Sequence, residues 1–255
     1  MLNWITEHAL HLTGVAIIAE LAVIGFSRQG SLDLREQLTS AGCIGLAYIT
    51  DHLFNGGLAF RYVMTQLTAG IESGASHAWA SWIICLLAID LQIYLWHRAS
   101  HALRPLWALH HVHHQSRQMT LIAALRQPAI GFFLPWLQLL PLALLGFPVE
   151  IAFSCLMAHH LWDFMLHMHF NPRLGVLGEL LMTPAHHRIH HSTEKRYYQS
   201  NLGTVLTIWD RVGGTYMSPR QITALDSLEL GTEVPVSELN PISANLKPLL
   251  RLFQS

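Results

Sequence analysis

Eight of the 18 histidines fall into three clusters with helical spacing. The clusters are His97 and His101; His110, His113 and His114; and His187, His190 and His191. Residues three and four apart share one face of an α-helix, so each cluster directs its imidazoles to one place. Neutral imidazole is a ligand for iron, zinc, copper and nickel. Three such faces that converge would hold more than one ion, and the sequence therefore predicts a polyhistidine metal centre.

The spacing of the clusters argues against a structural origin. A lone histidine at a membrane boundary would more often be an interfacial side chain than a ligand. However, the pattern H-x-x-H-H occurs twice, at residues 110–114 and again at residues 187–191. Chance clustering does not easily produce the same spacing twice. His111 and His186 adjoin the clusters but point off the shared faces, so we expect them to have supporting or surface roles.

Composition indicates a membrane protein. Of the 255 residues, 51% are hydrophobic and only 12% are charged, and the mean hydropathy is +0.32. Soluble domains average about 25% charged residues. The formal net charge of −1 provides no basic excess for nucleic acid, so we expect no nucleic-acid partner. Cys43, Cys85 and Cys155 lie in apolar stretches and indicate small buried side chains, not a disulfide framework.

Five apolar segments approach the length of about 20 residues that a helix needs to cross a bilayer. They are residues 9–26, 38–58, 78–96, 130–147 and 149–167. Gly146-Phe147-Pro148 joins the last two with almost no loop, which predicts a helical hairpin. We expect an all-α integral membrane protein with about four transmembrane helices, including this hairpin, and a cytosolic helical cap that holds the metal site.

Basic residues predict the orientation in the membrane. Arg28 and Arg35 lie between the first two apolar segments, and further arginines follow the third and the fifth, including Arg104 and Arg173. Only Arg61 falls on the opposite side. Because positive charge stays cytoplasmic, we expect a multi-pass protein with its N-terminus outside and every histidine cluster on the cytoplasmic side.

We divide the chain into three regions. Residues 1–77 hold the N-terminal transmembrane helices and their connecting loops. Residues 78–218 form the catalytic region, and residues 219–255 form a C-terminal tail with a short closing helix.

The segments around the clusters carry a resemblance to a known family. The segments are DLQIYLWHRASH at residues 90–101, LWALHHVHH at 106–114, TPAHHRIHHS at 183–192, NLG at 201–203 and WDRVGGT at 209–215. In order and spacing they resemble the three histidine boxes and the two closing signatures of the fatty acid hydroxylase/sterol desaturase superfamily. The resemblance covers roughly residues 81–216.

The resemblance implies a set of site residues. It makes metal ligands of the eight clustered histidines, and it places a further histidine just before Asn171. His169 is therefore our ninth predicted ligand, with His167 as a further candidate. Nearby acids are expected to orient the imidazoles through their second ring nitrogens. Asp210 and Asp163 are the candidates for that role, and Asp210 could equally cap a helix or pair with Arg211.

Two positions depart from the family pattern. The family usually has a phenylalanine where this chain has Gly213. It also often has an acidic residue shortly after the arginine that Arg126 matches, and residues 127–133 contain none.

The resemblance also implies a reaction. Two iron ions would bind O2 and remove hydrogen from an unactivated C–H bond of a lipid in the bilayer, such as a sterol or a fatty acyl chain. The product would be an alcohol; the alternatives are a desaturase or a C4-demethylating sterol oxidase, and more remotely a non-catalytic membrane metal-binding protein. Electrons would come from a separate electron-transfer protein, because the chain has no cysteine set for an iron–sulfur cluster. Purified protein could carry zinc, which binds such sites more tightly than Fe(II).

Overall fold

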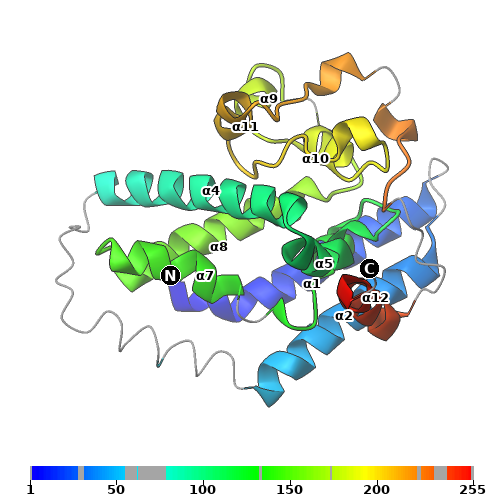
Figure 1. Ribbon diagram of the computed structural model, residues 1–255, viewed down its shortest axis with the longest axis horizontal. Coiled ribbons are helices and arrows are strands. Elements are labelled where there is room, and N and C mark those ends of the chain that lie inside the picture. The colour runs from blue at the N-terminus through cyan, green and yellow to red at the C-terminus, as the bar shows by residue number, and fades with distance from the viewer. Residues whose placement is uncertain are drawn as a thin grey trace.

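The computed structural model describes residues 2–27, 32–54, 62, 79–131, 134–172, 174–222, 225–232 and 240–253 (Figure 1). Within these residues the fold is helical, and the β pairing consists of two isolated bridges, Leu181 with Leu206 and Ser192 with Leu230. The α-helices are α1 (Leu2–Phe26), α2 (Leu34–Leu53), α4 (Trp79–Ala102), α5 (Arg104–His114), α6 (Leu121–Ala124), α7 (Leu134–Leu144), α8 (Val149–Leu166), α9 (Leu177–Leu180), α10 (Pro184–His190), α11 (Ile208–Gly213) and α12 (Pro241–Leu250).

The main apolar core lies where α4, α7 and α8 pack together. Figure 1 shows α4 and α8 side by side with α7 next to them. Ile89 of α4, Leu142 of α7 and Leu156 of α8 are each about 1% exposed within one cluster. The hairpin expected from the Gly-Phe-Pro breaker is present, because α7 ends at Leu144 and α8 begins at Val149.

One helix in the described part of the chain, α4, is long and apolar enough to cross a membrane. Residues His11–Phe26 of α1 form a shorter apolar stretch. The 11 residues of α7 rise only about 16 Å, roughly half the hydrocarbon thickness. The prediction of four crossings therefore rests on the hydropathy of the sequence. Within the described residues, the crossing at α4 also has a helix of the required length. Arg28, Arg61 and Arg173, on which the expected orientation partly rests, lie outside the described residues.

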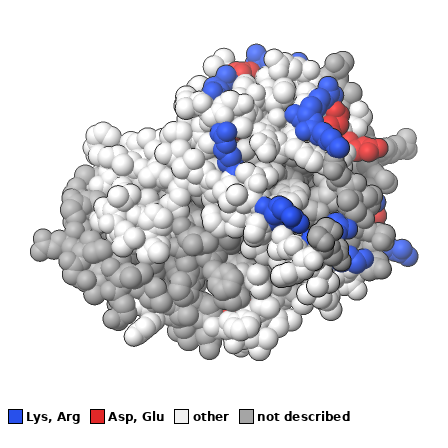
Figure 2. Space-filling model, in the orientation of Figure 1, with Lys and Arg blue, Asp and Glu red and all other residues white. Residues whose placement is uncertain are grey.

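The surface is divided between charged and apolar regions. In Figure 2 the charged side chains gather over the upper and right-hand part of the molecule, which carries α9 to α12. The described surface on the left, towards the first turns of α4, is uncharged in this view. Large apolar side chains of α4 such as Ile84 and Leu95 are more than half exposed. An apolar helix surface of this kind fits a lipid environment.

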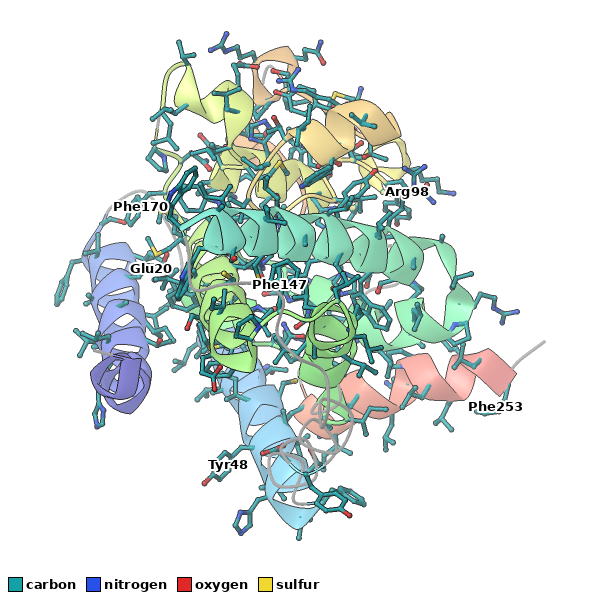
Figure 3. All side chains as sticks on the ribbon, turned by 90° about the vertical axis from the view of Figure 1, so that its left-hand side faces the viewer. Glu20, Tyr48, Arg98, Phe147, Phe170 and Phe253 are labelled. Atoms are coloured by element: carbon teal, nitrogen blue, oxygen red, sulfur yellow. The ribbon has the colours of Figure 1, made fainter. Side chains whose placement is uncertain are left out.

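The segment that carries α9, α10 and α11 is held against α4 by a buried acid. Figures 1 and 3 show these three short helices on one side of α4 and the longer helices on the other. Asp90 of α4 is 2% exposed and accepts hydrogen bonds from the backbone of Val205 and Leu206 and from Nε1 of Trp209, at 3.0, 3.1 and 2.8 Å. A single carboxylate of the candidate membrane helix therefore fixes the loop before α11.

The described C-terminal helix completes the fold beside the second histidine cluster. Asn240 caps α12, its side chain accepting hydrogen bonds from the backbone of Ile242 and Ser243. The helix then packs on α5 and α2. Ala244 of α12 is fully buried with Val112 of α5 and Cys43 of α2. The closing helix expected from the sequence is thus a packed element and supports α5, which carries three clustered histidines.

Candidate metal centre

Three helices bring the histidine clusters together. His97 and His101 lie in the last turns of α4, and α5 begins two residues after that helix ends. Pro105 lies in the first turn of α5, where its missing N–H costs nothing. In α10, Thr183 and His186 form a capping box ahead of the third cluster. His186 is thereby used in the helix cap: its Nδ1 lies 2.8 Å from the Thr183 hydroxyl.

The structure sorts the histidines into two groups. The first group is His97, His101, His110, His114 and His190, and the second is His113, His167, His187 and His191. In each group, one nitrogen per ring lies within 4.8 Å of the nitrogens of all the other members. The position of each histidine on its helix decides which group it joins. Both clustered histidines of α4 belong to the first group, whereas α5 and α10 contribute histidines to both groups.

The convergent atoms are the Nε2 nitrogens. In the first group, Nε2 of His114 lies 3.1 Å from Nε2 of His110 and 3.1 Å from Nε2 of His190. In the second group, Nε2 of His187 lies 3.0 Å from that of His167 and 3.1 Å from that of His191. Two ligands at right angles on a metal with bonds of about 2.1 Å would lie roughly 3.0 Å apart. The observed spacings therefore suit ligands that share one ion.

Hydrogen bonds assign the tautomers of three rings. Nδ1 of His97 lies 2.8 Å from the Leu202 carbonyl, Nδ1 of His190 lies 3.0 Å from the Ser200 carbonyl, and Nδ1 of His167 lies 2.9 Å from the Asp163 carbonyl. A carbonyl only accepts, so each Nδ1 carries the proton and donates it. Each Nε2 then presents a lone pair to its group. Lone pairs that converge in this way fit a bound cation. The buried Nε2 of His97 fits a metal ligand as well, because it has no hydrogen-bond partner among the described residues.

Burial keeps the clustered histidines in the ligand form. It lowers the pKa of His110, His113, His114, His187, His190 and His191 well below the ordinary value of 6.5. The first cause is loss of solvent around the charged form, and neighbouring histidines lower each pKa further. The rings are therefore neutral at neutral pH, and metal binding need not displace protons from them.

The fourth member of the second group is His167, and the structure does not bring His169 to either group. Helix α8 ends at Leu166, and His167 caps it with φ −86° and ψ −1°, so that its ring turns into the group. His169 lies beyond the helix end. Its backbone N–H donates to Glu20 of α1 at 2.7 Å, and its carbonyl accepts from Arg188 at 3.0 Å. The backbone of His169 is therefore held by hydrogen bonds on both sides, and its ring belongs to neither histidine group.

The predicted acids act on the site through the backbone. Asp210 is fully buried and accepts from the backbone of Leu202 and Gly203, both at 2.7 Å, and from the Thr215 hydroxyl at 2.6 Å. Burial raises the pKa of Asp210, and these hydrogen bonds oppose that shift. Asp163 contributes its carbonyl to His167. Among the described residues neither carboxylate forms a hydrogen bond with an imidazole of the two groups; the rings donate to peptide carbonyls instead.

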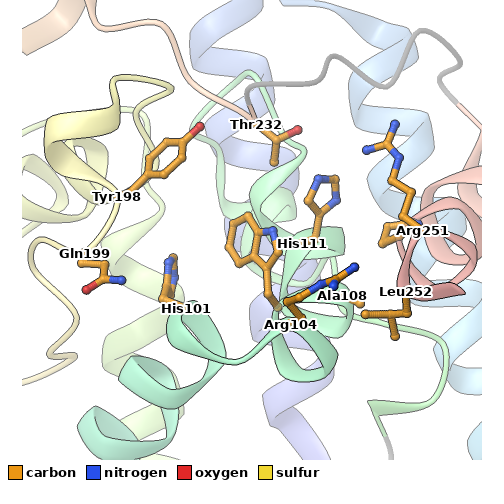
Figure 4. A pocket seen from close by; sticks show the side chains of 11 residues that line it. His101, Arg104, Ala108, His111, Tyr198, Gln199, Thr232, Arg251 and Leu252 are labelled. Atoms are coloured by element: carbon orange, nitrogen blue, oxygen red, sulfur yellow. The ribbon is translucent and has the colours of Figure 1, made fainter. Parts of the chain in front are cut away.

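A cavity reaches the first group from outside. It encloses about 340 Å³ and is lined by His101, Trp107, Tyr198 and other residues of α5 and α12, with Arg104 and Arg251 among them (Figure 4). No acidic side chain is among its lining residues in the described part of the chain. Trp107 lines the cavity beside the first group, with its ring centroid 5.0 Å from that of His101 and 5.4 Å from that of His114.

Sequence reasoning missed several residues that support the site. Asp90 opens the first family segment but received no role, and Glu36 gave no signal because it is a single acid within an amphipathic helix. Gly213, which departs from the family pattern, lies against the Tyr94 hydroxyl and Arg98, so a side chain at this position would collide with both. Arg98 donates to the Gly213 carbonyl at 3.0 Å and to the Tyr94 hydroxyl at 2.9 Å. Side chains from α4 thus fill the space that a phenylalanine would occupy.

Two groups of histidines, drawn from α4, α5, α10 and the end of α8, define an all-α protein with two candidate metal sites and an apolar helix of transmembrane length. Comparison with known proteins then gives its family. The family model described as fatty acid hydroxylase matches residues 82–215, more than half of the chain. The chain therefore belongs to the fatty acid hydroxylase family, as the histidine boxes predicted.

Curated relatives carry lipid-modifying names. The chain is 38% identical over 220 residues to an alkylglycerol monooxygenase of Danio rerio, covering 85% of this chain and 44% of the relative. It is 30% identical over 173 residues to the alkylglycerol monooxygenase of Homo sapiens, covering 68% and 38%. It is 28% identical over 178 residues to the ornithine lipid hydroxylase OlsE of Rhizobium tropici, covering 67% and 54%.

The chain spans about half the length, or less, of these relatives. Residues 82–215, which the family model matches, contain both histidine groups. No solved structure matches the chain.

Proposed function

We propose that this chain is a membrane-bound, O2-dependent hydroxylase of a lipid that holds one metal ion in each histidine group. The observation that carries the proposal is the convergence of nine imidazole nitrogens into two groups within a fatty acid hydroxylase family region. Its relatives are named as monooxygenases and hydroxylases of lipids. The non-catalytic metal-binding alternative is not favoured, because the relatives are named for enzymatic activities.

The proposed metal is iron, as family membership suggests. Two iron ions would supply the activation of O2 and the removal of hydrogen from an unactivated C–H bond. The chain's own part is to hold neutral imidazoles in place and to keep the site dry. Five of the six histidines in the second and third clusters are at most 5% exposed: His113, His114, His187, His190 and His191. Exclusion of water at such a site prevents side reactions of a reactive oxidant.

A lipid ether is the first substrate that we propose to test. Two of the relatives are named alkylglycerol monooxygenases, and the third is named for an ornithine lipid. Both names describe oxygen insertion into a lipid, which favours hydroxylation over the desaturase and sterol demethylase alternatives. A sterol desaturase of Candida glabrata also matches, at 31% identity over 138 residues, or 51% of this chain. Sterols therefore belong in the substrate panel as competitors.

We also propose that the histidine groups face the cytoplasm and that reducing electrons arrive there from a separate protein. The balanced reaction takes two electrons and two protons with O2 and releases one water beside the alcohol. Arg104 and Arg251 line the cavity that reaches His101, and no described lining residue is acidic. Such a surface would favour an acidic partner through electrostatic attraction.

The test is a product assay on the full chain in lipid nanodiscs. Iron-loaded protein, a chemical reductant and O2 are incubated with an alkylglycerol, an ornithine lipid or a sterol, and products are analysed by mass spectrometry. A gain of one oxygen atom supports the proposal, and label from ¹⁸O2 must appear in the product. Loss of two hydrogens identifies a desaturase. No product from any lipid, with two irons bound and reduced, would overturn the assignment as a hydroxylase.

A further inference from the structure

The loop between α10 and α11 supplies two hydrogen bonds to the first histidine group. The Ser200 carbonyl accepts from Nδ1 of His190 at 3.0 Å, and the Leu202 carbonyl accepts from Nδ1 of His97 at 2.8 Å. Two carbonyls of one short segment therefore hold two of the five rings, which come from two different helices.

Asn201, which lies between the two carbonyls, has an unusual backbone conformation. Its φ is +55°, and it is the one non-glycine residue with positive φ in the part of the chain that the structure describes. Asparagine tolerates this left-handed region better than most residues, because its short side chain can hydrogen-bond locally. The angle φ of Asn201 sets the direction of the Ser200 carbonyl relative to Leu202. A change in this angle would turn one carbonyl away from its histidine.

The Asn201 side chain fixes the loop in place. It is fully buried, and its Nδ2 donates to the carbonyls of His186 and Met217 at 3.2 and 3.0 Å. Its Oδ1 accepts from the backbone N–H of Met217 at 2.9 Å. His186 is the residue directly before the third histidine cluster. The amide therefore ties the carbonyl-bearing segment to the helix that carries His190.

Asp210 holds the other side of the same segment. Its two carboxylate oxygens accept from the backbone of Leu202 and Gly203. A side chain at Gly203 would lie 2.6 Å from one of these oxygens, so only glycine lets the backbone approach this closely. The loop is thus clamped on both sides of the Leu202 carbonyl.

We propose that Asn201 is a positioning residue for the first histidine group. By holding a left-handed turn, it aims the Ser200 and Leu202 carbonyls at Nδ1 of His190 and His97 and so leaves both Nε2 atoms as metal ligands. The turn provides neither of its two carbonyls to the second group, where the carbonyl that accepts from His167 belongs to Asp163. Loss of an outer hydrogen-bond partner of a ligating histidine typically weakens metal binding about 10–100-fold.

The test compares Asn201→Ala with Asn201→Gly. Both remove the amide, but only glycine adopts positive φ without steric cost. Co(II) is titrated into metal-free protein, and the ligand-field absorption of each bound ion is recorded. We expect Asn201→Ala to weaken the first group about 10–100-fold and to alter its absorption bands. Asn201→Gly should restore most of this affinity, and the second group should bind as in the wild type in both variants.

The second group serves as an internal control for folding. If Asn201→Ala weakens both groups equally, Asn201 acts on the fold as a whole and the proposal is overturned. The same holds if Ala and Gly behave alike, or if Ala binds two ions with wild-type spectra. The inference rests on the proposed two-metal site, but different results would contradict the inference and the proposed function. Wild-type protein that takes up no Co(II) contradicts the proposed function, whereas unchanged binding by Asn201→Ala contradicts only the inference.

Discussion

The guanidinium of Arg126 lies 3.0 Å from the carboxylate of Glu36, and these side chains are 2% and 3% exposed. Glu36 belongs to the first turn of α2, whereas Arg126 follows α6. The same Glu36 oxygen accepts from the backbone of Arg117 at 3.1 Å, and Arg126 also donates to the Gln115 side chain at 3.1 Å. Gln115 directly follows the histidines of α5. This buried pair therefore ties the N-terminal part of the chain to the end of a helix that serves both histidine groups.

Removal of one partner of this pair should destabilise the protein strongly. In Glu36→Ala the guanidinium of Arg126 stays buried without its counter-charge, which typically costs about 3–5 kcal/mol. The measurement is the free energy of unfolding in detergent, followed by circular dichroism. The matched control is Glu194→Ala, which breaks an exposed pair with Arg196 at 2.6 Å. Exposed pairs contribute roughly 0–1 kcal/mol, so equal losses in the two variants would contradict the prediction.

The Glu36–Arg126 pair is also a contact that the sequence did not predict. The family resemblance called for an acid shortly after Arg126, and the chain has none there. The structure supplies the acid from α2, 90 positions earlier. Local spacing predicts partners on one helix, because residues three and four apart share a face. It cannot predict which distant helix brings a charge, since that depends on packing.

The histidines themselves were well suited to prediction. Eight of them fall on helix faces whose geometry is fixed by spacing alone, and the structure brings all eight into the two groups. The division into two groups was not predictable, because neighbours such as His113 and His114 point to different groups. Helical spacing also could not identify the ninth ligand, since His167 and His169 lie where α8 ends and helical geometry no longer applies.

The ninth position yields a direct prediction. His167→Ala should lose about one metal ion per chain, because His167 is one of only four members of the second group. His169→Ala should keep both ions, because the structure fixes this residue by its peptide. Metal content is measured after dialysis against a weak chelator. If His167→Ala retains two ions, or if His169→Ala loses one, His169 would again be assigned as a ligand.

The stability of the metal-free protein should depend on pH. Folded-state pKa values of the buried histidines, such as His113, His114 and His187, lie well below 6.5 because burial disfavours the charged rings. Below about pH 6.5 the unfolded chain binds protons that the folded chain does not, so stability falls as pH falls. Above this pH both states are neutral at these rings, and the histidines add no pH dependence.

The measurement for this pH prediction is the thermal unfolding midpoint in detergent between pH 8 and pH 5, with a chelator present. A midpoint that stays level above about pH 6.5 and drops below it is expected. The control is His187→Gln, which removes one buried imidazole and should make the drop shallower. An identical slope in this variant would assign the effect to other groups.

The proposed orientation predicts which ends of α4 react from each side of the membrane. Trp79 begins this helix and is 76% exposed, whereas Leu103 follows its end and is 54% exposed. A membrane-impermeant maleimide should label Trp79→Cys from the outside and Leu103→Cys from the cytoplasmic side. Arg196→Cys, near the third histidine cluster, should behave like Leu103→Cys. The native cysteines Cys43, Cys85 and Cys155 are all buried, so the background should be low. Labelling of Trp79→Cys and Leu103→Cys from the same side would show that α4 does not cross.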